Sequence, residues 1–199
     1  MGNKIVIGID QSYKDTGITI GYNGKIMNCM HCYTENLKNN SFKRKELKLM
    51  LFQIFEMVFD KSRKLNADVI VIIERIRLQS QGFLNIDYIK SIGALNALIV
   101  DTAFGYNFPV YSVDTRAWKS SVIGNSKGMS NPYGIDEKKF PTILWCIKHG
   151  YKKYIINYDI GKRKKGVINN SYTYNDNIAD SIGICLYGFK SNQLLKPEH

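Results

Sequence analysis

Residues 4–33 read KIVIGIDQSYKDTGITIGYNGKIMNCMHCY. The run Lys4–Asp10 is rich in Ile and Val, and Gly17–Tyr22 alternates in polarity. The Asn-Gly pair at 23–24 is typical of a tight hairpin turn, and it leads into a third run over Lys25–Tyr33. This stretch therefore predicts three consecutive antiparallel strands.

Helices and strands alternate in the rest of the chain. The unbroken β-branched run Val69–Ile73 is typical of a strand covered on both faces. The apolar spacing predicts helices over Ser41–Leu65, Asn85–Phe104, Asp136–His149 and Tyr174–Phe189, and strands over Val69–Ile73, Pro109–Val113, Tyr154–Ile160 and Val167–Tyr174. We expect an α/β mixed sheet with helices on both faces, in a single domain over 1–199.

Charge indicates the kind of partner. The chain has 199 residues, 44% hydrophobic and 12% aromatic, which is typical of a globular domain. Lys and Arg number 28 against 17 Asp and Glu, a net charge of +11. A chain this basic favours a polyanionic partner such as nucleic acid over a merely solubilising charge.

Membrane and metal–thiol classes fit the sequence poorly. The longest apolar runs have five residues, against the roughly 20 that span a bilayer. Cys29 and Cys32 have a metal-like spacing, but thiols three apart on a strand face opposite sides. With Cys146 and Cys185 they indicate free thiols in an intracellular chain.

Four acidic residues stand at places where a charge is costly. Asp10 and Glu74 each end a run of buried aliphatics, and Asp176 and Asp180 lie about one helical turn apart. Each alone could be a solvent-exposed residue. If the two strands are neighbours and the last helix packs across their ends, all four converge. Such a cluster of hard oxygen ligands suits two Mg²⁺ ions, or Mn²⁺, which can promote phosphodiester hydrolysis.

The order Gly-Ile-Asp, Ile-Glu, Asn-Asp-Asn-Ile-Ala-Asp resembles that of the ribonuclease H-like superfamily, and more narrowly the RuvC family of Holliday-junction resolvases. The basic block from Arg116 to Gly124 resembles that family's segment after the fifth strand. The resemblance implies a ribonuclease H-like sheet and a Mg²⁺-dependent endodeoxyribonuclease that makes paired cuts in four-way junctions, leaving 5′-phosphates. It also implies a homodimer.

Site residues follow from the same resemblance. Asp10, Glu74, Asp176 and Asp180 would be both catalytic and metal-binding. Lys119 would contact the junction near the scissile phosphate, and Lys138 or Lys139 resembles a second family lysine. The full set of expected DNA-binding residues is Arg77, Arg116, Lys119, Lys127, Lys138, Lys139, Lys162, Arg163, Lys164 and Lys165.

Three departures from the family pattern stand out. The late acids are four apart instead of three, with Asn177 between them, and Arg77 stands where the family has an aromatic wedge. Residues 127–135 and a basic-tipped hairpin over 154–174 resemble insertions of the kind that phage-encoded members carry. The hairpin tip at 162–165 is either a solvated loop or a phosphate contact.

Other functions remain open from the sequence. Gly-Ile-Asp also opens actin-like kinases, but the second phosphate loop of that class is missing here. A ribonuclease H-like nuclease acting on RNA–DNA hybrids or on precursor RNA would carry the same acids. A non-catalytic protein that binds branched DNA would have no reason to keep four repelling carboxylates. On the helix Asn85–Phe104, the small residues Ser91, Ala94 and Ala97 predict close packing against the sheet or a dimer partner.

Overall fold

A mixed sheet of six strands forms the centre of the molecule. The computed structural model describes residues 2–12, 14–34, 40–75, 86–124, 139–158, 172–190 and 196–197. The strands lie in the order β3-β2-β1-β4-β5-β8. Their bounds are Asn3–Asp10 (β1), Asp15–Tyr22 (β2), Lys25–Tyr33 (β3), Ala67–Glu74 (β4), Val110–Val113 (β5) and Lys196–Pro197 (β8).

Strand direction changes at β1. The β1–β2–β3 meander is antiparallel, and the Asn23-Gly24 turn closes its second hairpin with both residues at positive φ. On its other side β1 pairs in parallel with β4, and β4 pairs in parallel with β5. The register sets Ile9 beside Ile73, so the carboxyl ends of β1 and β4 meet at one edge of the sheet.

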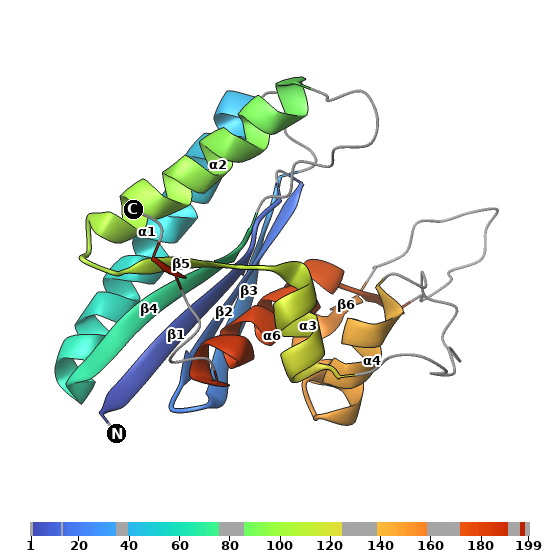
Figure 1. The fold of residues 1–199 in the computed structure, drawn as a ribbon. Helices are drawn as coiled ribbons and strands as arrows, with labels where there is room; N and C mark the ends of the chain where they lie inside the picture. The colour runs from blue at the N-terminus through green and yellow to red at the C-terminus, as the bar shows by residue number, and fades with distance from the viewer. Residues whose placement is uncertain are drawn as a thin grey trace.

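Helices cover both faces of the sheet (Figure 1). Asn40–Leu65 (α1) and Ile86–Phe104 (α2) lie on one face, over a core of aliphatic side chains from β1, β2 and β4. Thr115–Val122 (α3), Phe140–Lys148 (α4) and Asp176–Lys190 (α6) lie on the other face, with Trp118 fully buried between α3 and the sheet. The expected α/β mixed sheet with helices on both faces is confirmed.

Several element boundaries differ from the prediction. Helix α3 was not predicted as a helix, although Asp114 caps it by accepting a hydrogen bond from Arg116 N at 2.9 Å. The chain after Gly150 first forms a short helix, Lys152–Ile155 (α5), before the strand Ile156–Tyr158 (β6). This strand pairs with Tyr172–Tyr174 (β7), and the tip between them lies outside the described residues.

The small-residue ridge on α2 does not pack on the sheet. Ile92, Leu95 and Ile99 are the buried residues of this helix, whereas Ala97 is exposed and Ser91 is half-buried. The alternative of a packing surface for a partner stays a prediction. No helix in the described ranges is long and apolar enough to cross a membrane. The four cysteines are free thiols.

Helix α6 lies unusually close to the sheet. A Cβ atom on Gly8 would lie 2.5 Å from Cys185 N and 2.6 Å from Ser181 O, both backbone atoms. At Gly17 it would collide with the carbonyl group of Asn177. A buried hydrogen bond of 2.7 Å between the Thr19 and Ser181 hydroxyls also joins β2 to α6. Only glycines allow this helix to approach the two strands so closely.

We predict that Gly8→Ala lowers the free energy of unfolding by about 1–3 kcal/mol, because the new methyl group meets backbone that cannot move independently. Gly93→Ala is the control, since a Cβ there meets nothing within 4 Å and the residue lies inside α2. The control should be neutral or stabilising by up to about 1 kcal/mol. Urea unfolding monitored by circular dichroism measures both variants. Equal stabilities would contradict the packing described here.

Candidate active site

Asp10 and Glu74 stand side by side at one edge of the sheet. Each is the last residue of its strand, and β1 and β4 are parallel neighbours up to the pair Ile9 and Ile73. Both strands are buried on both faces just before these acids. The sheet therefore fixes the backbone positions of the two carboxylates and meets the condition that their strands be neighbours.

Helix α6 brings Asp176 and Asp180 to the same edge. Asn175 begins the helix: its Oδ1 accepts a hydrogen bond from Ile178 N at 2.8 Å, and its backbone oxygen accepts one from Ala179 N at 3.2 Å. Asp176 lies in the first turn, where the helix dipole favours an anion. Asp180 follows one turn later and is partly buried.

Electrostatics show that the four acids act on one another. Burial, followed by the charges of Asp180, Glu74 and Asp176, raises the pKa of Asp10 well above its usual range. Burial also raises the pKa of Asp180 to about 6, with Lys119 opposing the rise and the charges of Glu74 and Asp176 adding to it. The edge of the sheet is thus a site where negative charge is costly and a cation would be stabilising.

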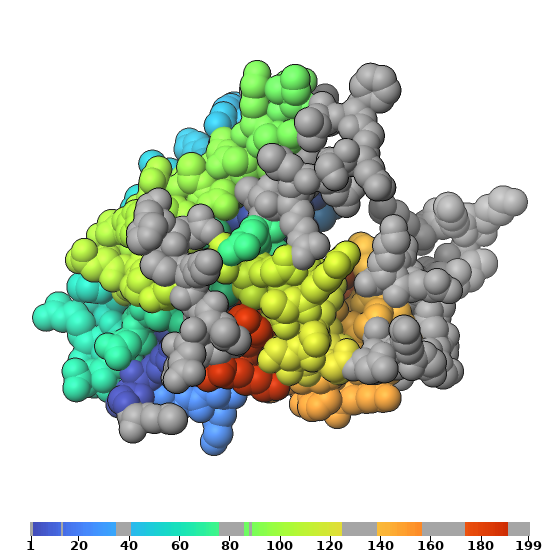
Figure 2. All heavy atoms as spheres, in the orientation of Figure 1, coloured from blue at the N-terminus to red at the C-terminus, as the bar shows by residue number. Residues whose placement is uncertain are grey.

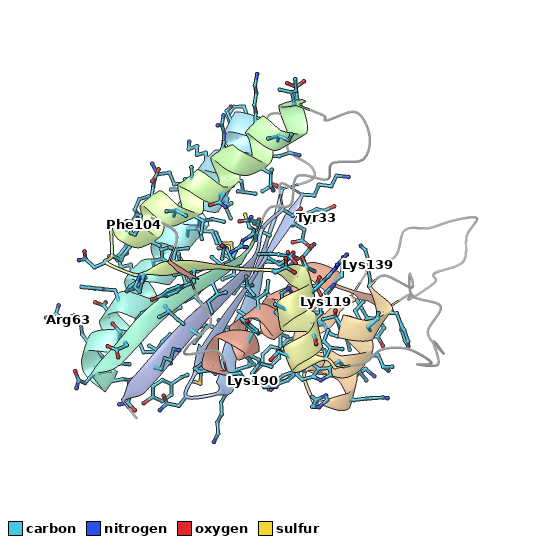
Figure 3. The ribbon with its side chains drawn as sticks, in the orientation of Figure 1. Tyr33, Arg63, Phe104, Lys119, Lys139 and Lys190 are labelled. Atoms are coloured by element: carbon cyan, nitrogen blue, oxygen red, sulfur yellow. The ribbon has the colours of Figure 1, made fainter. Side chains whose placement is uncertain are left out.

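Two lysines partly offset this charge. Lys119 Nζ, from α3, lies 3.5 Å from Asp180 Oδ2, and Lys139 Nζ, at the start of α4, lies 2.7 Å from Asp176 Oδ2. In Figure 3 both lysines lie at this end of the sheet, whereas Lys190 lies at the far end of α6. Lys119 also lies 5.0 Å from the centre of the Trp118 ring.

The four acidic residues are of the chemical type that binds a divalent cation, but their side chains are not arranged around a single ion. Four carboxylates are hard oxygen donors of the kind that Mg²⁺ and Mn²⁺ prefer. One buried oxygen beside them, Gln11 Oε1, has no hydrogen-bond partner among the described residues. Within the same residues, however, no group of three or more His, Cys, Asp or Glu side chains is placed to hold one ion. Ligation would require carboxylates now turned to the lysines to rotate inward.

Glu74 has two supports that the sequence did not reveal. Trp118 Nε1 donates to Glu74 Oε1 at 3.3 Å, and Gln11 Nε2 donates to the Glu74 backbone oxygen at 3.1 Å. Trp118 can reach Glu74 because Gly183 leaves room for its ring against α6. No local pattern links these positions, since they are joined only by the packing of α3 on α6 and the sheet.

A second network holds the start of α6. Asn175 Nδ2 donates to Asp15 Oδ2 at 2.6 Å, and His31 Nδ1 lies 2.8 Å from Asp15 Oδ1. The hydrogen bond to Asp15 raises the pKa of His31. Burial raises the pKa of Asp15, but hydrogen bonds from His31 and Asn175 and the charge of His31 outweigh burial and lower it. The N-cap preference for Asn was a usable signal for Asn175; the contact with Asp15 was not.

The expected DNA-binding residues fall into two groups. Arg116 is exposed in the first turn of α3, and Lys119 and Lys139 border the acids. The others lie outside the described residues and stay predictions: Arg77, Lys127, Lys138, Lys162, Arg163, Lys164 and Lys165. The predicted insertion at 127–135 is likewise outside them.

Comparison with solved structures identifies the fold. RuvC of Thermus thermophilus in complex with a Holliday junction substrate aligns over 98% of this chain and 99% of its own, with a TM-score of 0.60 and 13% identity. The chain has a RuvC-like, ribonuclease H-like fold. A second T. thermophilus RuvC structure aligns over the same shares, with a TM-score of 0.59. The yeast mitochondrial Holliday junction resolvase aligns over 93% of this chain and 77% of its own, with a TM-score of 0.48 and 16% identity. No protein-family model matches the sequence, and no curated protein matches it.

The Asp15–His31 pair predicts a pH-dependent stability. Because the pKa of His31 is raised, its contribution is complete below about pH 6.5 and is lost as pH rises through the folded-state value. Because the pKa of Asp15 is lowered, its contribution is lost only in acid, below about pH 4. His31→Gln should therefore lower the melting temperature more at pH 6 than at pH 9.

The expected size is small because 37% of the His31 side chain is exposed. We expect a difference of about 0.5 kcal/mol between the two pH values, measured by thermal unfolding. In an Asp15→Asn background, His31→Gln should have the same effect at both pH values. A pH-dependent effect that survives in that background would disprove the pairing.

Proposed function

We propose that this chain is a structure-selective endodeoxyribonuclease that resolves Holliday junctions and other branched DNA by paired phosphodiester hydrolysis. One observation carries the proposal: Asp10, Glu74, Asp176 and Asp180 interact electrostatically at one sheet edge, bordered by Lys119 and Lys139. The reaction would serve DNA recombination and repair in the cytoplasm of a bacterium or an infected host cell.

The carboxylates would hold two Mg²⁺ ions, or Mn²⁺ in their place. Such ions, when bound, activate a water molecule and stabilise the leaving oxygen of a phosphodiester. Asp10 is central because the other three acids all act on it. Glu74 keeps its orientation through Trp118, and Asp176 and Asp180 keep theirs through the capped start of α6.

In this proposal Lys119 and Lys139 each have two alternative partners, an aspartate and a DNA phosphate. Without DNA they neutralise Asp180 and Asp176. Both side chains are partly exposed to solvent, at 33% for Lys119 and 52% for Lys139, so each can turn to a phosphate of bound DNA. The same motion releases the two aspartates for the cations. DNA binding and completion of the metal site would thus support one another.

A homodimer would supply the two active sites that paired cuts in a two-fold symmetric junction need. The α1–α2 layer offers a surface for it. Phe42 and Leu49 on α1 and Ile86 on α2 are exposed there, at 59%, 49% and 61%. This layer lies on the opposite face of the sheet from α3 and α4, so that dimerisation there would leave the face with Lys119 and Lys139 uncovered (Figure 1).

Cleavage of the junction should require Asp10, whereas binding of the junction should not. Asp10→Asn should reduce the cleavage rate of a four-way junction at least 100-fold in Mg²⁺, because a central carboxylate is lost. Affinity for the junction should stay equal or rise, since removing an anion reduces the repulsion of phosphates. Asp60→Asn, an exposed change on α1, is the matched control and should cut normally. Wild-type rates for Asp10→Asn would exclude the catalytic role.

Binding should depend on Lys119. Lys119→Ala should weaken junction binding and reduce the slope of log K against log salt concentration by about one unit, since one phosphate contact is lost. Lys64→Ala on α1 removes the same charge from the other face of the sheet and should change neither quantity. Fluorescence anisotropy over a salt series, with Ca²⁺ replacing Mg²⁺, gives both. An unchanged salt slope for Lys119→Ala would refute the contact.

Assembly can be disrupted on α2. Ala97→Arg should convert the dimer to a monomer, because it places a long cation on the proposed helix-packing surface. Ser120→Arg, an exposed change on α3, is the control and should remain dimeric. Sedimentation velocity at micromolar concentration distinguishes the two species. A wild-type protein that stays monomeric, also on the junction, would rule out the dimeric resolvase.

A further inference from the structure

A second group of cations lies at the far end of α4. Residues 139–158 contain four lysines and no acidic residue. One of them, Lys139, borders the acid cluster. The others, Lys148, Lys152 and Lys153, are exposed together with His149 around the turn from α4 to α5. We call these four residues the distal basic patch.

The turn holds the patch in a fixed shape. Gly150 has φ +83°, Tyr151 N donates to Cys146 O at 2.8 Å, and Gly150 N donates to Ile147 O at 3.3 Å. This pair of hydrogen bonds is the Schellman arrangement that ends a helix with a left-handed glycine. The start of α5, and with it Lys152, is therefore fixed relative to the end of α4.

Three stacked aromatic rings lie at the same turn. The His149 ring lies 4.1 Å from the Trp145 ring, at an interplanar angle of 19°. The Tyr151 ring lies 5.8 Å from the same Trp145 ring. His149 Nδ1 also lies 2.8 Å from Trp145 O. Because these rings stack on one another, the lysine side chains are the groups left for a ligand, and of these Lys153 Nζ lies 4.8 Å from the centre of the Tyr154 ring. Such a surface suits phosphates better than unstacked bases.

The position of the patch indicates which phosphates it can reach. Helix α4 starts at the acid cluster and has nine residues, so it carries the patch about 13 Å away from it. At about 3.4 Å per base pair along a duplex, this is about four base pairs. Figure 2 shows α3 and the α4–α5 region adjoining on one face of the molecule.

We propose that the distal basic patch binds the phosphate backbone of a duplex arm of the junction, about four base pairs from the scissile phosphate. The contact rests on the proposed function, because it needs a DNA duplex at the acid cluster. It would position an arm without reading its sequence, since ammonium groups contacting phosphates carry no base information.

The test neutralises both sides of the contact. Lys152→Gln with Lys153→Gln removes two charges and keeps most of each side-chain stem. The DNA is a four-way junction whose phosphates three to six base pairs from the branch are methylphosphonates, which are uncharged. Fluorescence anisotropy is measured in Ca²⁺ over a salt series. On ordinary DNA, the slope of log K against log salt concentration should be about two units smaller for the variant than for wild type. On the neutralised junction, wild type and variant should bind alike.

Lys61→Gln with Lys64→Gln, on the opposite face of the sheet, is the matched control and should behave as wild type on both junctions. Lys148→Gln is an independent test, and it should reduce the slope of log K against log salt concentration by about one unit. The inference is overturned if the patch variant keeps the wild-type slope, or if it loses as much affinity on the neutralised junction as on the ordinary one. Failure of the wild-type protein to prefer a four-way junction over linear duplex would instead overturn the proposed function.

Discussion

Close backbone contact between α6 and the sheet is the constraint on which the candidate site depends. Gly8 and Gly17 present no side chain where α6 crosses β1 and β2, so the helix backbone lies directly against the strands. This distance determines how near Asp176 and Asp180 come to the strand end that carries Asp10. Trp118 fits against Gly183 of the same helix and reaches Glu74 from there. One packing contact thus positions acids from three separate parts of the chain.

The acid cluster opposes folding and favours ligand binding for the same reason. Burial, and then the charges of the neighbouring acids, raise the pKa of Asp10 and Asp180, so these carboxylates are costly to bring together. Two lysines reduce that cost by pairing with Asp180 and Asp176. Since both lysine side chains are partly exposed to solvent, the pairs can be exchanged for phosphates and divalent cations. A cluster that is only partly neutralised by the protein is suited to binding cations from solution.

Local patterns predicted the elements whose signals lie within one segment. The Asn-Gly turn and the β-branched run ending in Glu74 identified the strands, whereas the sequence left open whether the two acid-bearing strands are neighbours; the structure pairs them in parallel. Helix α3 was missed because its eight residues are too short for a periodic pattern, although Asp114 is a recognisable cap. The roles of Trp118 and Asp15 arise from contacts between residues 44 and 160 positions apart, which no spacing rule reveals. The α2 ridge was ambiguous because small residues suit a sheet and a partner helix equally.

The central claim is that the four carboxylates together bind two divalent cations, which requires Asp176 and Asp180 to leave Lys139 and Lys119. Anomalous diffraction from crystals soaked in Mn²⁺ tests this directly. We predict two peaks beside the four carboxylates, with the two lysine pairs broken. A contrary result would be no peak at the edge where β1 and β4 end, with Asp176 and Asp180 still paired to their lysines at millimolar Mn²⁺.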